Sequence, residues 1–586
     1  MPIRGLDQEL TKGGNLHTPS VEILKDGIIG VDGGWFIRKY FNTLGARTPP
    51  HGGEEARFLQ QIRGLVATLG RIDCKVVWIW SGMAPKTAIQ KPEGHRVSRL
   101  QKSYARYNAS AQGGPEHDSG KSILSTTVLA VQVEQSVTVL LRGLGVEVIY
   151  APYAAAAQGA YMTRQKYLTM FFGSTDYFLF NGGESLITDF FFTNQHPSQN
   201  APQNTPQNTP QNAPQNAPQS TPQTMHAPST AQPVPVPFKI AVASRSWLLK
   251  KLDLAYFKMS ESLLLMGCEY CSTVPAHSLN FRFRTVLGAL ALYGSAVNYI
   301  REKSESSSKS YLEEFLTAKA CVEYHPVINE HGSVVCLKET DVPCDLSSIF
   351  GKKLPDEIYL AFSKGECSRE YISGLAFEEV RVLGSERVLA SFQPIANTLY
   401  KTGVRMRCSA VGGGTKEVTT TRETQTLAQA AGSPLLPISG IPISVQWLVL
   451  LLARKDESLL NNIFVFNNTF TSVPPNEDVD WEVVEFTESV RLGTALITDA
   501  LNHGREKVID ETVSIDPVNG WRMARILKQT KERKDAETAP RPEQAGDLKK
   551  NLNFIQSLLS LLDKNALASL KLVQDLRALA ASIDGK

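Results

Sequence analysis

Short apolar runs alternate with helix-like segments along the first half of the chain. The runs are rich in β-branched and aromatic residues, and the segments between them repeat apolar positions at helical spacing. We predict strands at residues 28–31, 75–80, 146–150 and 177–180, and helices at residues 54–69, 128–144 and 154–161. Strands that alternate with helices predict a parallel α/β sheet with flanking helices. In such sheets ligands bind beyond the carboxyl ends of the strands, where Asp32, Ser81, Tyr153 and Asp176 fall.

A low-complexity tract interrupts this pattern at residues 195–237. A Pro-Gln-Asn phrase recurs there every four residues, and bulky apolar side chains are almost absent. Such a tract cannot bury enough apolar surface to offset the entropy lost on ordering, so we predict that it is disordered. Strand-like sequence flanks it at residues 186–192 and 238–242. The tract is therefore predicted to be an insertion within one domain and not a linker between two.

Two polar joints divide the remaining chain. Residues 302–310 are rich in Ser, Lys and Glu, and residues 528–546 are highly charged. We expect an N-terminal domain at 1–303, a mainly α C-terminal domain at 311–528, a charged linker at 529–546 and an amphipathic helix at 547–583. The last helix has a single apolar stripe that requires a partner surface. That surface is either its own C-terminal domain or, in a coiled coil, another chain.

Composition narrows the class of protein further. Of the 586 residues 42% are hydrophobic and 20% are charged, as in ordinary globular domains, and the formal net charge of +3 does not indicate a nucleic-acid-binding protein by itself. The first six residues contain no apolar signal segment, and the most apolar run, 445–453, is too short to span a membrane. Eight cysteines without a secretory signal indicate reduced thiols. We therefore expect a soluble cytoplasmic protein without membrane contact.

Several phrases along the first 300 residues resemble the flap endonuclease and XPG family of structure-specific nucleases. They lie at residues 1–6, 29–33, 80–85, 150–157, 174–176 and 292–296. For example, residues 80–85 resemble the family's Phe-Asp-Gly-x-x-Pro phrase, with Ser81 in place of the aspartate. The resemblance implies an XPG- and PIN-like fold for the predicted sheet, with the disordered Pro/Gln/Asn insertion inside it.

Metal-binding carboxylates decide between an enzyme and a non-enzyme. The resemblance implies that Asp32 and Asp176 match two of the family's metal ligands. Uncharged residues stand at five other positions where the family has acids, namely Ser81, Ala154, Ala156, Ser174 and Ala296. Two-metal hydrolysis of a phosphodiester needs a cluster of carboxylates around two cations, and Mg²⁺ prefers oxygen ligands in an octahedral arrangement. We therefore predict a pseudo-nuclease without a cofactor. The alternative, a structure-specific nuclease with an altered metal site, would require Mg²⁺.

Four further phrases are similar to the MKT-type post-transcriptional regulators, which join a degenerate XPG-like domain to a C-terminal domain of their own. They lie at residues 151–153, 175–176, 266–268 and 354–359. The resemblance implies a cytoplasmic, non-catalytic scaffold of mRNA–protein complexes that acts on mRNA stability or translation. It also implies an ataxin-2-like partner and, through that partner, poly(A)-binding protein, with mRNA contacted directly or indirectly. A purely structural interaction protein without RNA contact is a third hypothesis.

A basic stretch after Pro85 is the candidate nucleic-acid-binding site. It contains Lys86, Lys91, Arg96, Arg99, Lys102 and Arg106, together with Tyr104 and Tyr107. Positive side chains can follow a phosphate backbone and aromatic rings can stack on bases, but a solvated helix face has the same composition. Cys268 and Cys271 have the spacing of half a zinc site, but no second pair follows, so we interpret them as two ordinary thiols.

Overall fold

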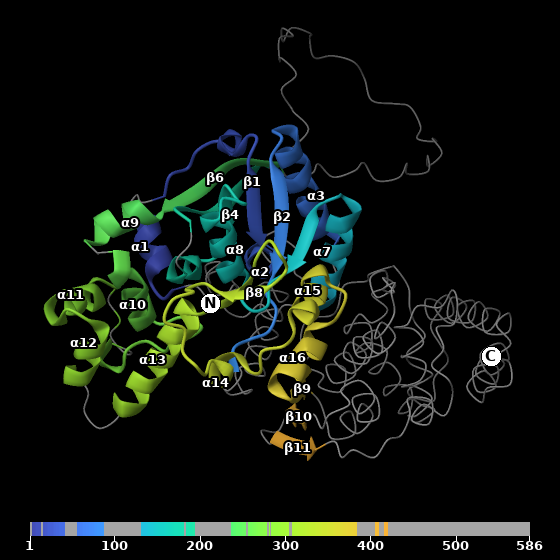
Figure 1. The fold of residues 1–586 in the computed structure, drawn as a ribbon. Coiled ribbons are helices and arrows are strands. Elements are labelled where there is room, and N and C mark those ends of the chain that lie inside the picture. Colours follow the sequence, from blue (N-terminus) through green and yellow to red (C-terminus); the bar gives the residue numbers. More distant parts are fainter. Residues whose placement is uncertain are drawn as a thin grey trace, which may run out of the picture.

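A six-stranded sheet forms the centre of the computed structural model, in the strand order β3-β2-β1-β4-β5-β6 (Figure 1). The strands are β1 (Ile28–Asp32), β2 (Lys75–Trp80), β3 (Glu147–Tyr150), β4 (Met170–Phe172), β5 (Ser185–Thr193) and β6 (Val236–Ser244). Neighbouring strands from β3 to β5 run parallel, and β6 runs antiparallel to β5. The predicted α/β class with a mostly parallel sheet is confirmed. The structure describes residues 3–12, 16–40, 56–86, 131–180, 183–193, 236–253, 256–277, 281, 283–303, 308–383, 405–409 and 415–419.

The strands predicted at 28–31, 75–80 and 146–150 are confirmed as β1, β2 and β3, whereas the strand predicted at 177–180 is wrong. Tyr177, Phe178 and Leu179 lie in a buried 3-10 helix, η2 (Thr175–Leu179), and Phe180 follows it. The strand lies earlier, as β4, and the chain turns after it because the Tyr177 N–H donates to the Ser174 carbonyl at 3.1 Å. A short apolar run without periodicity is compatible with either a buried strand or a helical turn.

The strands that flank the predicted insertion pair with each other. The ladder between β5 and β6 runs from Ser185 opposite Ser244 to Thr193 opposite Val236. This is the arrangement expected of an insertion within one domain, since its two ends start from neighbouring strands. The insertion predicted at 195–237 lies outside the described residues, apart from its last two residues in β6.

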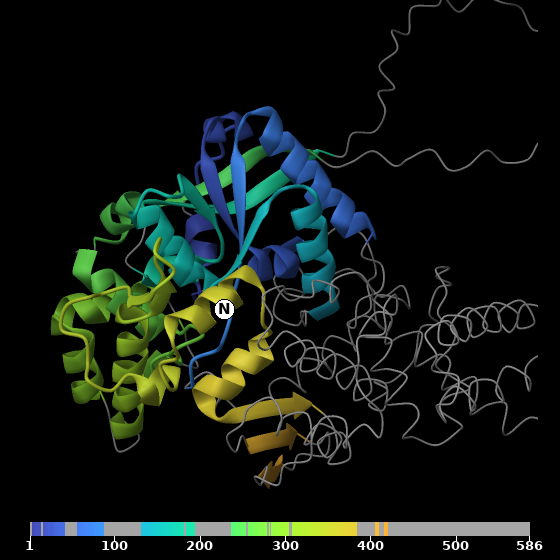
Figure 2. The ribbon, with the colours of Figure 1, turned by 45° about the vertical axis from the view of Figure 1, so that its right-hand side comes forward.

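Helices cover both faces of the sheet (Figures 1 and 2). On one face lie α2 (Gly33–Tyr40), α3 (Ala56–Arg71) and α7 (Val131–Gly143), which share a buried apolar cluster with β1 and β2. On the other face lies α8 (Ala155–Arg164). This helix approaches the sheet closely at Gly159, where a Cβ atom would lie 2.3 Å from the Phe171 ring. Only glycine allows this contact, because any side chain would push α8 away from β4.

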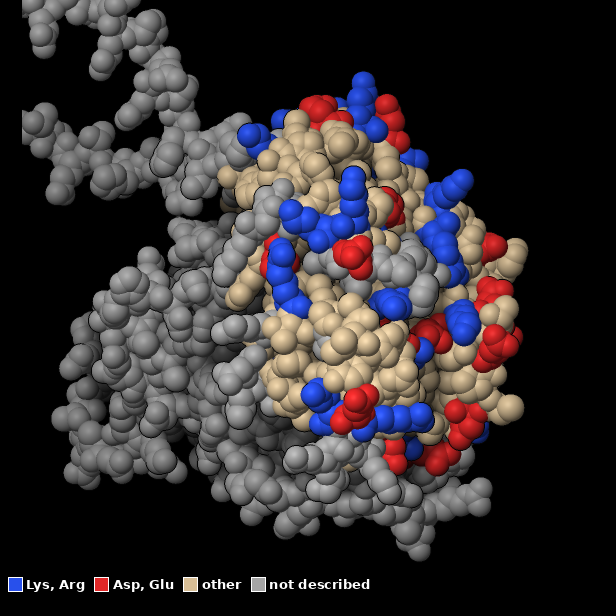
Figure 3. Space-filling model, turned by 90° about the vertical axis from the view of Figure 1, so that its left-hand side faces the viewer, with Lys and Arg blue, Asp and Glu red and all other residues tan. Residues whose placement is uncertain are grey.

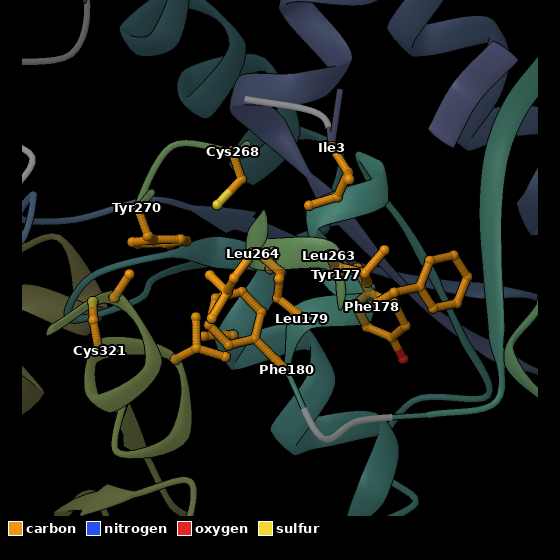
Figure 4. Packing of buried hydrophobic residues seen from close by; sticks show 14 of the residues in the cluster. Ile3, Tyr177, Phe178, Leu179, Phe180, Leu263, Leu264, Cys268, Tyr270 and Cys321 are labelled. Atoms are coloured by element: carbon orange, nitrogen blue, oxygen red, sulfur yellow. The ribbon is translucent and has the colours of Figure 1, made fainter. Parts of the chain in front are cut away.

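A second group of helices packs beside α8 (Figure 1). It consists of α1 (Leu6–Lys12), α9 (Arg245–Leu252), α10 (Tyr256–Met266), α11 (Phe283–Tyr293), α12 (Ala296–Lys303) and α13 (Ser308–Glu323). Two 3-10 turns, η1 (Val21–Leu24) and η3 (Pro275–His277), precede β1 and α11 in the chain. Leu263 and Leu264 of α10 are fully buried and lie beside Leu179 and Phe180 (Figure 4). None of the described helices is long and apolar enough to cross a membrane.

The next elements fold back onto the sheet. They are β7 (Pro326–Ile328), β8 (Val334–Cys336), α14 (Ser347–Phe350), α15 (Asp356–Lys364) and α16 (Arg369–Phe377), followed by a small sheet of β9 (Glu379–Leu383), β10 (Arg405–Ser409) and β11 (Thr415–Thr419). Side chains from α13 to α16 belong to the same buried cluster as α8 and α10. The core is thus continuous across the domain boundary predicted at 303. Most of the predicted domain 311–528 beyond 383, the linker 529–546 and the helix 547–583 lie outside the described residues.

Candidate active site at the carboxyl edge of the sheet

Asp32 and Asp176 come together at the carboxyl edge of the sheet. Asp32 ends β1, and its Oδ1 accepts the N–H of Trp35 at 2.9 Å, which caps the first turn of α2. Asp176 lies in η2, where the hydroxyl of Ser174 donates to its carboxylate. Both side chains are almost fully buried, at 9% and 8% exposure. The two acids predicted from the sequence are therefore neighbours in a largely dry environment.

This environment disfavours two negative charges. The pKa of Asp176 is raised to about 7, mainly by burial; the nearby charges of Asp32 and Glu269 also raise this pKa, and the charge of Arg38 opposes them. Burial also raises the pKa of Asp32. Glu269, an exposed residue just before Tyr270, is not among the acids predicted from the sequence, because it belongs to none of the phrases that resemble the nuclease family.

Ser81 caps a helix at one of the positions where the nuclease family has an acid. It follows β2, and its Oγ accepts the N–H of Ala155 at 3.1 Å, in the first turn of α8. Its carbonyl oxygen accepts a hydrogen bond from Arg369 Nη2 at 2.8 Å. Arg369 also forms an ion pair of 2.9 Å with Glu134 of α7. Ser81 thus joins β2, α8 and α16 in one polar contact.

A buried histidine caps the start of α8 at Ala154. Nε2 of His325 lies 3.2 Å from the Ala154 nitrogen, and Nδ1 lies 3.1 Å from the Cys321 carbonyl oxygen. These partners assign the neutral tautomer in which Nδ1–H donates to Cys321 and Nε2 accepts from Ala154. Burial lowers the pKa of His325 to about 4, which agrees with a neutral ring. The N–H group that opens α8 is therefore satisfied by the chain itself.

Four aromatic rings enclose His325. Their centroids lie between 5.1 and 6.1 Å from the imidazole, and they belong to Tyr153, Phe180, Tyr270 and Phe350. The hydroxyl of Tyr153 also donates to the Phe350 carbonyl. The sequence gives no signal for this arrangement, since none of the ten histidines stands in a recognisable motif.

The remaining two positions, Ala156 and Ala296, are also buried. Ala156 lies in the first turn of α8 within the apolar cluster, at 3% exposure. Ala296 begins α12 and is fully buried. A carboxylate does lie near Ala296, because Glu261 Oε2 accepts the Ala296 N–H at 3.3 Å. The other oxygen of Glu261 forms an ion pair with Lys319 of α13 at 2.6 Å. Glu261 therefore joins its own helix, α10, to α12 and α13.

Hydrogen bonds continue along one face of α8 to residues 325–337. The side-chain amide of Gln158 donates to the Ile328 carbonyl at 2.8 Å and accepts the Ile328 N–H at 2.9 Å, as a neighbouring strand would. One turn further, Tyr161 donates to Glu330 at 3.3 Å, and Arg164 donates to the Leu337 carbonyl at 3.0 Å. The face of α8 that begins at Ala154 is thus covered along its length by the β7–β8 hairpin. Gln158, a lone amide in a helix of small residues, is the only sequence signal for this contact.

These residues do not fit a pair of metal ions. Among the residues that the structure describes, no three His, Cys, Asp or Glu side chains form a group that could hold a metal ion. The alanines at 154 and 156 supply no donor atoms, and the N–H groups of Ala154 and Ala155 are bonded to His325 and Ser81. A Mg²⁺ ion needs several oxygen ligands around it. The buried carboxyls of Asp32 and Asp176 offer too few.

Little of the candidate nucleic-acid-binding site can be placed. Lys86 is exposed and follows the turn after β2, whereas Lys91, Arg96, Arg99, Lys102 and Arg106 lie outside the described residues. On the face formed by the second helical group, Lys and Arg side chains are spread out and acidic side chains lie among them (Figure 3). Cys268 and Cys271 are buried thiols, and the Cys271 Sγ lies 3.7 Å from the Tyr311 hydroxyl oxygen.

Two curated proteins are similar to this chain over much of its length. The post-transcriptional regulator MKT1 of Cryptococcus neoformans is 20% identical over 416 residues, which are 65% of this chain and 48% of the relative. The post-transcriptional regulator mkt1 of Schizosaccharomyces pombe is 23% identical over 406 residues, which are 62% of this chain and 47% of the relative. The chain spans about half the length of these relatives. They confirm the resemblance to MKT-type regulators, while no family model matches the chain.

Solved structures of nucleases are also similar, at low scores. The catalytic core of Rad2 in complex with DNA substrate has a TM-score of 0.32 and 13% identity, and the match covers 64% of this chain and 95% of that one. Flap endonuclease-1 from Methanococcus jannaschii has a TM-score of 0.32 and 14% identity, with 60% of this chain and 90% of that one covered.

Proposed function

We propose that this chain, similar over nearly two thirds of its length to curated post-transcriptional regulators, is a non-catalytic regulator that acts as a scaffold on mRNA–protein complexes. One observation of the structure carries the non-catalytic part. The start and one face of α8, which would present two metal-binding glutamates in the nucleases that the sequence resembles, instead bind the chain's own residues 325–337.

The chemistry of the remaining acids supports this proposal. Phosphodiester hydrolysis by two metal ions needs carboxylates that bind both cations and offset their charge. Asp32 and Asp176 are buried, and the pKa of Asp176 near 7 means that it is partly protonated at neutral pH. A protonated carboxyl is a poor metal ligand, since metal ions compete with protons for the same oxygen atoms. The proposed role of these side chains is to hold α2 and η2 in place.

The scaffold role and its setting follow from the resemblance to MKT-type regulators. We propose a cytoplasmic protein that joins an ataxin-2-like protein and, through it, poly(A)-binding protein on mRNA. The support is the similarity to two proteins described as post-transcriptional regulators. The basic residues from Lys86 to Arg106 would provide direct RNA contact, and the partner would provide indirect contact.

A cleavage assay tests the non-catalytic part. Purified full-length chain is incubated with flap, hairpin and single-stranded DNA and RNA in Mg²⁺ or Mn²⁺, beside an Asp32→Ala, Asp176→Ala double variant. We expect no cleavage by either protein. Cleavage that the double variant loses would establish the alternative, a nuclease with an altered metal site, whereas cleavage that both proteins share would indicate a contaminant.

Affinity purification tests the scaffold part. The tagged full-length chain is recovered from cell extract with and without ribonuclease, and the bound proteins are identified. We expect an ataxin-2-like protein and poly(A)-binding protein in both samples. Recovery of DNA-repair proteins in their place would contradict the proposal. Binding of the pure chain to single-stranded RNA at several salt concentrations separates direct from indirect contact, because phosphate contacts weaken steeply with salt.

A further inference from the structure

Residues 325–377, which we call the cover, contact the carboxyl edge of the sheet at three places. The hairpin of β7 and β8 lies along α8, as described above. Phe362 of α15 packs against Tyr150 at the end of β3, with ring centroids 5.6 Å apart. Gly82, just after β2, lies under the same ring, since a Cβ atom there would be 2.7 Å from Phe362 Cε1. The cover thus lies beyond the ends of β2 and β3 (Figures 1 and 2).

Polar contacts hold the far end of the cover. Arg369 of α16 donates to the Ser81 carbonyl and pairs with Glu134, whose side chain is only 8% exposed. Arg142 of α7 donates to the Lys364 carbonyl at 2.7 Å, at the end of α15. One guanidinium group therefore joins α16 to the residue after β2 and to the first turn of α7.

The apolar anchors of the cover decide whether it can open. Large side chains from α14, α15, α16 and the segments between them are at most 6% exposed, namely Ile349, Phe350, Leu354, Tyr359, Phe362 and Ile372. These side chains belong to one buried cluster with residues of α8 and α10, so release of the cover would divide that cluster and open the ring cage of His325. The free energy of burying six such side chains is of the same order as the total stability of a domain. A lid that opens during function would need far fewer buried anchors.

We propose that the cover is a permanent part of the fold, closed in every native molecule, and that it keeps nucleic acid away from the buried first turns of α8. RNA contact, where it occurs, takes place on other surfaces. This inference rests on the proposed non-catalytic function, but its test reads hydrogen exchange, so the inference and the proposed function can fail separately.

Hydrogen exchange of single amides tests the proposal on the full-length chain. The Ala154 N–H is bonded to His325 and the Ile328 N–H to Gln158, so both amides report loss of contact between the cover and α8. The Gln158 N–H is bonded to the Ala154 carbonyl within α8, at 3.2 Å, and it reports unfolding of the helix itself. Exchange is measured at neutral pH, where His325 is neutral, with and without a single-stranded RNA probe.

A permanent cover opens only when α8 unfolds. We therefore expect the Ala154 and Ile328 amides to exchange within about tenfold of the Gln158 amide, and RNA to leave this ratio unchanged. Exchange of both reporter amides more than about tenfold faster than Gln158, with or without RNA, would overturn the proposal, because it would reveal a cover that opens alone. If the protein cleaved nucleic acid while the reporter amides stayed fully protected, the proposed function would be wrong, but the inference of a closed cover would hold.

Discussion

His325 and Ala154 are 171 positions apart in sequence, yet the imidazole of one accepts the N–H of the other at 3.2 Å. This contact places a neutral, buried side chain at the start of α8, where the sequence resemblance implies an acid in the nucleases. It also fixes the position of residues 325–337 on the helix. The proposed loss of an acid and the covered helix are therefore parts of one arrangement.

Replacement of His325 by alanine should destabilise the protein. The change leaves the Ala154 N–H and the Cys321 carbonyl without partners and opens a cavity among four rings. We expect a loss of about 2–4 kcal/mol in the free energy of unfolding, measured by chemical denaturation. His331→Ala is the matched control, since its side chain is 78% exposed, and it should change stability by less than ~0.5 kcal/mol. Equal effects of the two changes would contradict the structural role of His325.

Two buried groups should give opposite pH dependences of stability. His325 has a pKa of about 4 in the folded chain against 6.5 in model compounds, so the unfolded state binds more protons between these values and stability rises with pH. Asp176 has a pKa of about 7 against 3.8, so the folded state binds more protons and stability falls as pH rises. The raised pKa of Asp32 acts in the same direction as that of Asp176. With two carboxyls opposing one histidine, the stability of the wild-type protein should not rise with pH between about 4 and 6.5.

Single variants separate the two effects. In Asp176→Asn, stability should fall by up to about 1.4 kcal/mol per pH unit as the pH drops from 6.5 towards 4. In His325→Ala, stability should instead fall as the pH rises through the same range towards 7. Denaturation midpoints at several pH values measure both slopes. A slope of the same sign in the two variants would be incompatible with the assignment.

Arg369→Gln should show the strength of the contact between α16 and α7. The change leaves the buried carboxylate of Glu134 without its ion pair and removes the hydrogen bond to Ser81. The side chain of Arg369 is 36% exposed, so we expect a moderate loss of about 1–3 kcal/mol. Arg284→Gln breaks an exposed pair with Glu9, and the 71% exposed arginine should contribute less than ~1 kcal/mol. Thermal denaturation of both variants gives the comparison.

Restoration of an acid in α8 should not rebuild a metal site. Ala156 is 3% exposed within the apolar cluster, so Ala156→Glu would bury a carboxyl without a partner. We expect a loss of roughly 2–5 kcal/mol in stability and no measurable binding of Mn²⁺ by calorimetry. Ala84→Glu, at an exposed position after β2, serves as the control and should be nearly neutral. Tight Mn²⁺ binding by a stable Ala156→Glu protein would show that a metal site had survived.

The sheet could be predicted from sequence, because strands buried on both faces form continuous apolar runs between helices. The same rule failed at Tyr177 to Phe180, where an equally apolar run forms a 3-10 turn. It failed because apolar character alone does not distinguish a short strand from a buried turn.

The sequence places Asp32 and Asp176 near the carboxyl ends of the strands, and the structure has Asp32 at the end of β1 and Asp176 in η2, after β4. The contacts that replace the other acids could not be predicted. His325 reaches the start of α8, and Arg369 reaches Ser81 and Glu134, from elements distant in sequence, and no local pattern marks a residue for such a contact. Gln158 is a partial exception, because an amide in a helix of alanine and glycine suggests a buried polar partner.

The pairing of Thr193 with Val236 determines how the Pro/Gln/Asn tract can change in length. It brings the two ends of the Pro/Gln/Asn tract to neighbouring positions at the outer end of one ladder. The entropy of closing a loop grows only with the logarithm of its length, so each doubling costs about 0.6 kcal/mol. Gain or loss of four-residue units would therefore be nearly neutral for folding. A change in repeat number at this site should therefore leave the pairing of β5 with β6 in place.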